Sequence, residues 1–315
     1  MRTLARLERW KAEGVITGGQ FDLIAPLVRK DRFSVFLELN VLLYLGVLSF
    51  IAGVGWTIQT YFASLGDAAI ISALTLLLGL SFYYCSSRAL PYSREQVGSP
   101  NMAFDYVLYG ACLAYGVEVG YIESRFHLLQ NYWDVYLLIS SLLLFALAYR
   151  FDNRLVLSLA LSTLAGWFGL RISRFGLGYG ESLRPYALAY GALISGIGLS
   201  LHWLRIKQHF LETYLHIAAN MIFIALVSGV SEADVAWLYL AGLLIAGTVA
   251  VIQGVRRNRF VFVAYGTVYS YIGVSIEILR RTRIDTPFAL SYLIVSSALI
   301  IVSMIVLARR FGREE

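Results

Sequence analysis

Charged residues are scarce in this sequence. Asp, Glu, Lys and Arg make up 15% of its 315 residues, whereas an ordinary soluble domain contains about 25%. Hydrophobic residues account for 58% of the chain, and the mean hydropathy is +0.68. This balance excludes an ordinary soluble protein and places the chain in the membrane class.

Cysteine is also scarce, and the familiar motifs of nucleotide and hydrolase chemistry are missing. Cys85 and Cys112 lie in apolar segments without a CxxC spacing, which excludes a disulfide framework and a zinc ribbon. The chain has no GxxxxGK(S/T) or GxSxG motif, and no GxGxxG after a strand. We therefore predict no cofactor. The formal charge is +6, but the basic residues stand at the ends of apolar runs, so nucleic acid is not a predicted partner.

Ten apolar segments are long enough to cross a bilayer, because a helix needs about 20 apolar residues to span roughly 30 Å of hydrocarbon. They are residues 36–62, 68–86, 104–121, 132–149, 155–172, 186–204, 210–230, 235–253, 260–279 and 288–307. An even number puts both termini on one side. That side would carry 19 Lys and Arg residues and the other side 7, so the positive-inside rule predicts cytoplasmic termini. The expected fold is an all-α polytopic transmembrane bundle.

The residues before the first span have the pattern of a short helical hairpin. Apolar residues recur at helical spacing up to Trp10, and Gly14 is placed to end that helix. Thr17 and Gln20 have the spacing of a capping box that starts a second helix. We interpret the hairpin either as an amphipathic element on the headgroups or as a module that docks a cytoplasmic partner. The chain then divides into a cytoplasmic hairpin (1–34), a transmembrane bundle (35–307) and a cytoplasmic basic tail (308–315).

Glycine is frequent inside the predicted spans. Gly116 and Gly120 form a GxxxG spacing, which lets helix backbones approach closely in lipid. We call such a close contact between two helix backbones a seam. Other candidate seams contain Gly53, Gly55, Gly166, Gly169, Gly191, Gly196, Gly198, Gly242 and Gly247. Asn153-Arg154 before one span resembles Asn258-Arg259 before another, which suggests either repeated hairpins, as in many transporters, or chance similarity.

Several of these features together resemble a known family. They are Leu7-Glu8-Arg9-Trp10, Gly14-Val15-Ile16, Gln20, Leu45-Gly46, Gly53-Val54-Gly55, Gly110, Gly116, Gly120 and Phe126-His127. The pattern resembles the bacterial multipass proteins of domain of unknown function 2157 over the first half of the chain. The resemblance implies an integral inner-membrane protein with a cytoplasmic helical N-terminal segment. It implies no activity, so no catalytic residue is carried over.

Charged residues at the non-cytoplasmic ends of three spans form the first candidate site. Glu118 lies within an apolar span, where an acid costs about 2.5–3.5 kcal/mol, so it should face protein or water. Arginine forks at the same depth could grip a carboxylate or phosphate. The alternatives are mutually neutralising ion pairs or arginines that reach to the headgroups. The candidates for binding a small or anionic solute are Glu118, Glu123, Arg125, Arg171, Arg174, Glu277 and Arg280.

A second candidate lies on the cytoplasmic side. His209, Glu212 and His216 fall within about 60° of arc at the start of the seventh span. Two imidazoles and a carboxylate suit Zn²⁺, Fe²⁺ or Mn²⁺, but no HExxH motif accompanies them. An ordinary polar stripe is the alternative to a metal site.

Three functions are therefore open for this protein of the lipid bilayer. A transporter-like carrier of a small or anionic solute rests on Glu118 and the arginine-bearing loops. A membrane-embedded enzyme that modifies a lipid rests on the histidine stripe. A sensory or scaffold protein rests on the N-terminal hairpin. We rank the carrier first, because the enzyme lacks a nucleophile constellation and a scaffold needs no charge within a span.

Overall fold

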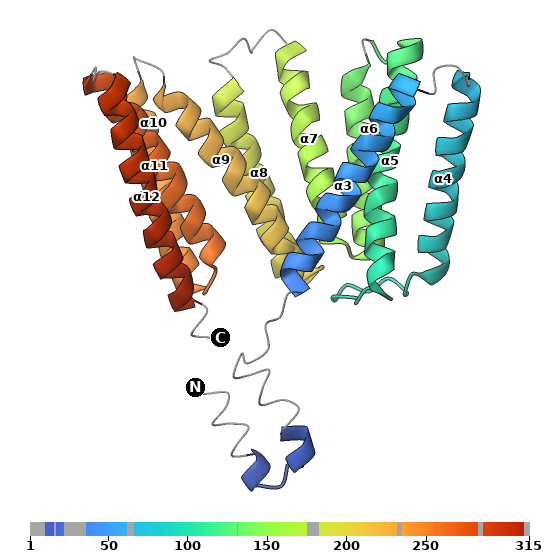
Figure 1. Cartoon of the computed structure of the whole chain (residues 1–315), viewed down its shortest axis with the longest axis horizontal. Coiled ribbons are helices and arrows are strands. Elements are labelled where there is room, and N and C mark those ends of the chain that lie inside the picture. The colour runs from blue at the N-terminus through green and yellow to red at the C-terminus, as the bar shows by residue number, and fades with distance from the viewer. Residues whose placement is uncertain are drawn as a thin grey trace.

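The structure is a computed structural model, described for residues 10–15, 17–21, 36–61, 66–130, 132–174, 183–231, 235–282 and 286–311. Within these ranges the chain forms ten long α-helices and no strand (Figure 1). The helices are α3 (Phe36–Tyr61), α4 (Asp67–Arg88), α5 (Met102–Phe126), α6 (Trp133–Phe151), α7 (Arg154–Arg174), α8 (Leu183–Trp203), α9 (Leu211–Val230), α10 (Ala236–Arg256), α11 (Phe260–Thr282) and α12 (Thr286–Phe311). A short 3-10 helix, η3 (Gln208–Phe210), leads into α9.

Each of the ten predicted segments coincides with one of these helices, which confirms the all-α polytopic bundle. In the described residues, seven helices are long and apolar enough to cross a membrane by length and composition. They are α4, α6, α7, α9, α10, α11 and α12. In α3 the apolar stretch is the shorter segment Leu42–Val54.

The helices follow one another as antiparallel hairpins. α4 packs on α5, α6 on α7, α8 on α9, and α10 on α11, while α9 also contacts α7, α10 and α11. α3 begins and α12 ends at the lower end of the bundle in Figure 1. We call this end the terminal face and the opposite end the far face.

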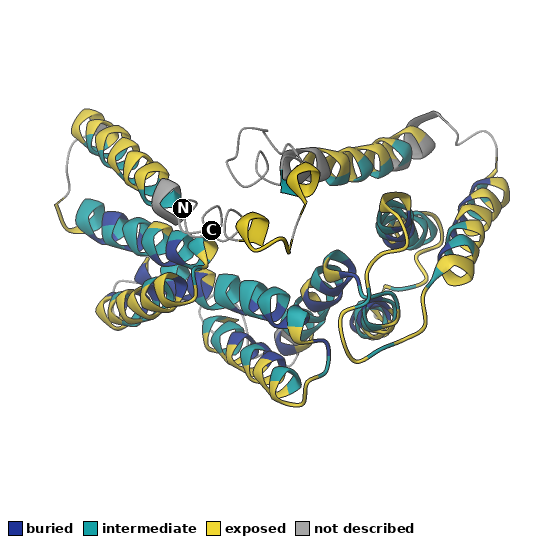
Figure 2. Ribbon diagram, turned by 90° about the horizontal axis from the view of Figure 1, so that it is seen from below, coloured by how far each residue is buried: buried dark blue, intermediate teal, exposed yellow. Residues whose placement is uncertain are grey.

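Apolar side chains cover the outward sides of the bundle. Leu76 and Leu80 on α4, and Leu299 and Ile301 on α12, are more than half exposed, and exposed residues line both helices in Figure 2. Such a surface is suited to contact with lipid. Buried hydroxyls of the interior bond to neighbouring helices instead. The buried Tyr190 hydroxyl, for example, donates a 2.6 Å hydrogen bond to the Leu161 carbonyl.

Only some of the predicted glycine seams lie at close helix contacts. A Cβ on Gly191 would lie 3.0 Å from the Ala218 carbonyl oxygen, and one on Gly247 would lie 3.0 Å from the Gly266 carbonyl oxygen. Among the described residues, a Cβ on Gly116 or Gly120 would meet no atom within 4 Å outside its own helix. The GxxxG prediction is therefore wrong, because this face of α5 is not pressed against another backbone. Gly53, Gly169 and Gly196 are likewise open.

The described part of the N-terminal hairpin contains the predicted capping box. Thr17 N–H donates to Gln20 Oε1 at 2.9 Å, and Gln20 N–H donates to Thr17 Oγ1 at 3.3 Å. Gly14 has a φ of +72° and ends the preceding turn. The Val15 N–H then bonds back to the Trp10 carbonyl, as expected for a left-handed helix cap. The rest of the hairpin lies outside the described residues.

Candidate functional site

Glu118 lies within α5, eight residues before its end at Phe126. At 1.5 Å per residue this places Glu118 roughly 12 Å inside the far face. The Thr75 hydroxyl of α4 lies 2.5 Å from Glu118 Oε1 and 2.9 Å from the Ile71 carbonyl oxygen. Among the described residues, no cationic side chain pairs with Glu118. Thr75 is exposed and Glu118 is half-buried, so the carboxyl is held by one hydroxyl on an open side of the α4–α5 pair.

Arg125 lies beyond Glu118, at the far end of α5. Its Nε is 2.7 Å from Asp67 Oδ1 at the start of α4, and the Tyr121 hydroxyl donates to the same oxygen at 2.8 Å. The side chains of Arg125 and Asp67 are 45% and 29% exposed. Water therefore competes for both ions, and pairs of this kind stabilise little.

We expect Arg125→Gln to leave the thermal unfolding midpoint of the protein in detergent unchanged within error, because this ion pair is exposed. Tyr121→Phe, which removes the second hydrogen bond to Asp67, is the matched control. A clear fall in the midpoint for Arg125→Gln would mean that this pair clamps α4 to α5.

Two other far-face candidates have partners of their own, and the side chain of a third is not among the described residues. Glu123 accepts a 2.6 Å hydrogen bond from the Leu129 backbone N–H and so caps the end of α5. Arg171 on α7 is 2.6 Å from Asp134 on α6, whose side chain is only 4% exposed. The side chain of Arg174 lies outside the described residues.

Glu277 pairs within its own helix. Both Arg280 and Arg281, one turn along α11, form ion pairs with its carboxylate. The far-face charges thus fall into separate groups on α4 and α5, on α6 and α7, and on α11. In the described part of the chain, Glu118 contacts neither Arg171 nor Arg280. A shared solute site built from these residues stays a prediction.

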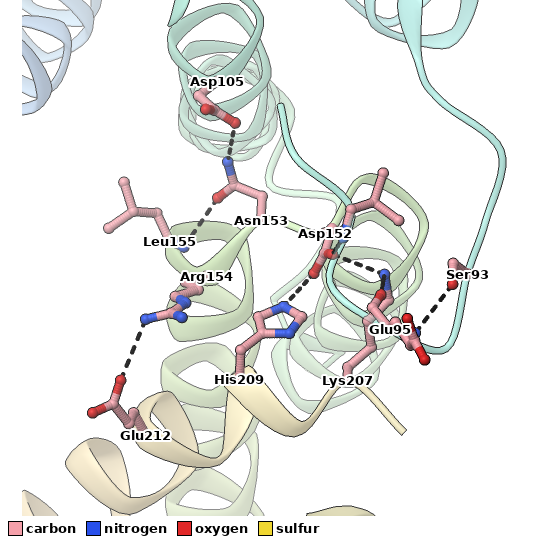
Figure 3. A network of polar contacts seen from close by, with 11 residues as sticks. Ser93, Glu95, Asp105, Asp152, Asn153, Arg154, Leu155, Lys207, His209 and Glu212 are labelled. Carbon is pink, nitrogen blue, oxygen red and sulfur yellow. Dashed lines mark hydrogen bonds and ion pairs between the residues drawn. The ribbon is translucent and has the colours of Figure 1, made fainter. Parts of the chain in front are cut away.

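The most deeply buried charges lie at the terminal face. Lys207, between α8 and α9, is 1% exposed, and its Nζ is 2.9 Å from Asp152 Oδ2 in the turn between α6 and α7. His209 Nε2 lies 2.5 Å from the other oxygen, Asp152 Oδ1 (Figure 3). A buried lysine is tolerated because its charge is paired and hydrogen-bonded.

Lys207 and Asp152 also bind the segment between α4 and α5, residues 89–101. This segment has no regular secondary structure. Lys207 donates from its backbone N–H to the Arg94 carbonyl at 2.7 Å and from Nζ to the Glu95 carbonyl at 3.1 Å. The Val97 N–H donates to Asp152 Oδ2 at 2.5 Å. These contacts join three connecting segments of the terminal face in one network, which Figure 3 shows.

Glu212, in the first turn of α9, bridges two further connections. Its Oε2 accepts from Arg154 Nη1 at 3.3 Å, and its Oε1 pairs with Arg259. Arg154 begins α7, and Arg259 immediately precedes α11. Nearby, Asn153 caps α7 by accepting hydrogen bonds from Leu155 and Val156 N–H at 3.0 Å.

The three members of the predicted histidine stripe have different neighbours. His209 bonds to Asp152, Glu212 pairs with arginines, and His216 stacks on Phe262 with ring centroids 4.8 Å apart. Within the described ranges, no group of three His, Cys, Asp or Glu side chains is arranged to hold a metal ion. The arrangement is thus a polar stripe in which each side chain has its own partner.

Three turns of the terminal face repeat one backbone geometry. Asp152, Arg205 and Asn258 all have a φ between 54° and 55°, and they follow at intervals of 53 residues (205 − 152 and 258 − 205). In each turn the next N–H bonds back five residues: Asn153 to Ala148, Ile206 to Leu201, and Arg259 to Gly254. The sequence echo between Asn153-Arg154 and Asn258-Arg259 is one residue out of register with this geometry, because the backbone counterpart of Asn258 is Asp152 and not Asn153. The intervening turn at Arg205 was missed because its side chains differ.

Comparison with known proteins supports a family for the first half of the chain. Residues 8–157 match the family described as "Predicted membrane protein (DUF2157)". The match contains Glu118, Asp152 and Arg154 but ends before Lys207 and Glu212. No curated protein and no solved structure matches the chain. Residues 8–157 of this membrane protein are thus similar to the DUF2157 family, as the motifs indicated.

Proposed function

We propose that the protein is a membrane carrier in which Glu118 binds and releases a proton. The observation that carries this proposal is the Glu118–Thr75 pair, roughly 12 Å inside the far face and held by a hydroxyl rather than a cation. A carboxyl group at such a depth is costly, and acids within spans commonly mark ion and proton pathways.

The surroundings of Thr75 support two protonation states of Glu118. The Thr75 hydroxyl has one hydrogen but two acceptors in reach, Glu118 Oε1 and the Ile71 carbonyl oxygen. When Glu118 is ionised, Thr75 donates to it. When Glu118 is protonated, it donates to Thr75, and Thr75 donates to Ile71. Neither state leaves an unsatisfied donor, so a proton can come and go without disrupting the helix pair.

The proposed solute is small and anionic, because a proton carried with an anion offsets the cost of moving negative charge through hydrocarbon. The far-face candidates Arg125, Arg171, Arg174 and Arg280, with Glu123 and Glu277, remain proposals for its binding. We also propose that the terminal face is cytoplasmic, in an inner membrane, because 19 of the 26 Lys and Arg residues fall on that side.

The carrier proposal is tested with purified protein in liposomes that contain a pH-sensitive dye. A pH gradient is imposed while valinomycin and potassium clamp the voltage. We expect protein-dependent proton flux with wild type and only the leak of empty liposomes with Glu118→Gln. The amide keeps the size and the Thr75 hydrogen bond but cannot exchange a proton.

Glu95→Gln is the control, because it removes an exposed carboxylate from the segment between α4 and α5 at the terminal face, which the proposal does not use. We expect this variant to retain the wild-type flux. Wild-type flux in Glu118→Gln, or no protein-dependent flux in wild type, would contradict the role proposed for Glu118.

A further inference from the structure

We infer that Arg154 and Arg259, at the terminal-face ends of α7, α9 and α11, form a binding site for a phosphate group, for which the Glu212 carboxylate competes. The phosphate belongs either to a lipid headgroup or to a soluble phosphate compound. The inference does not depend on Glu118 or on transport.

Two guanidinium groups share one carboxylate at this place. Arg154 and Arg259 come from different turns and meet on one carboxylate, Glu212. The two other acids nearby are engaged elsewhere: Asp105 accepts from Asn153, and Asp152 pairs with Lys207 and His209. Among the described residues, Glu212 is therefore the one carboxylate that contacts the two arginines.

The helix ends add partial positive charge. α7, α9 and α11 are 21, 20 and 23 residues long, all begin at the terminal face, and α9 contacts both of the others. Each helix N-terminus carries the equivalent of roughly +0.5 charge. Asn153 already accepts from two N–H groups of α7, so at that end the helix dipole, and not free N–H groups, would attract an anion.

Both arginines can accept a further anion. A guanidinium has five N–H donors, and the side chains of Arg154 and Arg259 each use one nitrogen, Nη1, on Glu212. Neither side chain has another hydrogen-bond or ion-pair partner in the described residues. They are 47% and 56% exposed, so their remaining donors are accessible to a ligand. The planar fork matches phosphate oxygens in a bidentate manner.

A buried nitrogen of His216, one helix turn from Glu212, has no hydrogen-bond partner among the described residues. His216 lies one turn deeper than Glu212 on α9, and its ring stacks on Phe262 of α11. Its Nδ1 is buried and has no hydrogen-bond partner in the described part of the chain. An oxygen of the bound ligand, or a water molecule that enters with the ligand, would form the missing hydrogen bond with this nitrogen.

The test uses full-length protein in nanodiscs and follows the thermal unfolding midpoint at constant ionic strength. Inorganic phosphate is titrated into protein in phosphatidylcholine nanodiscs, and separate nanodiscs contain phosphatidylglycerol. A rise in the midpoint with added phosphate assigns a soluble ligand. A rise only in phosphatidylglycerol nanodiscs assigns a lipid headgroup. No rise in either case overturns the inference.

Variants separate a specific site from general charge. We expect Arg154→Gln/Arg259→Gln to weaken the response about tenfold or more, since two charge-assisted contacts are lost. Glu212→Gln should bind more tightly than wild type, because the competing carboxylate becomes neutral. Arg257→Gln, which removes an exposed arginine from the same turn, is the matched control and should respond as wild type.

The double variant leaves Glu212 without its arginines and could unfold for that reason. The same measurement is therefore made on Arg154→Gln/Arg259→Gln/Glu212→Gln, in which all three side chains are neutral and similar in size. Loss of the response in this variant supports the site. A wild-type response in it, or an equal loss in Arg257→Gln, would show that the anion binds elsewhere.

Discussion

Replacing Lys207 with methionine is expected to lower the free energy of unfolding by about 3–5 kcal/mol, the usual cost of breaking a buried ion pair. Lys207 and Asp152 have side chains only 1% and 3% exposed. Methionine fills similar space but leaves the Asp152 carboxylate buried with His209 as its remaining side-chain partner. The Glu95 carbonyl also loses its donor. Denaturant titration of the protein in mixed micelles measures the change.

A second substitution shows whether the loss comes from charge. Lys207→Met/Asp152→Asn removes both ions, so it should recover part of the stability lost in Lys207→Met. Lys11→Met, in the exposed N-terminal segment, is the control for losing a lysine. If Lys207→Met is as stable as wild type, water must reach Asp152. The network would then contribute little to holding the three connecting segments of the terminal face together.

The second large effect is expected at the contact between α10 and α11. A Cβ on Gly266 would lie 2.5 Å from the Gly247 carbonyl oxygen and 2.9 Å from Val251 Cγ2. The first of these neighbours is backbone and cannot rotate away. We therefore expect Gly266→Ala to lower the free energy of unfolding by about 1–3 kcal/mol, as overpacked sites do.

Gly196→Ala is the matched control, because it makes the same change inside α8 where no atom lies within 4 Å of the added Cβ. Alanine favours a helix over glycine by about 0.8–1.0 kcal/mol, so this variant should be at least as stable as wild type. The two substitutions are thus predicted to act in opposite directions in the same denaturation measurement. Equal effects would mean that α10 and α11 do not approach at Gly266.

The glycines illustrate what spacing alone can and cannot predict. GxxxG at Gly116 and Gly120 is the best-known seam pattern in the chain, yet it faces no neighbouring backbone. Gly247 was among the candidates, but its partner Gly266 was not. A seam needs small residues on two helices that also lie side by side, and one helix sequence describes only half of that condition.

The polar residues show the same limit. Lys207 reads in the sequence as one more basic residue of a connecting segment, and its burial depends on Asp152, which lies in another turn. Glu212 was predicted with His209 and His216 from helical spacing, but its partners, Arg154 and Arg259, come from other connections. Asp134 lies near a span end in the sequence, yet it is the buried partner of Arg171.

The sequence by itself determined that this is a membrane protein, where its ten helices lie, and how its N-terminal turn is capped. Those features depend on local physics: hydrocarbon accepts only segments that satisfy their own backbone, and a capping box involves residues three apart. Only the tertiary structure decided which charges pair and which glycines touch. Such contacts join residues far apart in the chain, as Asp152 and Lys207 are, and they form only when packing brings particular helix ends together.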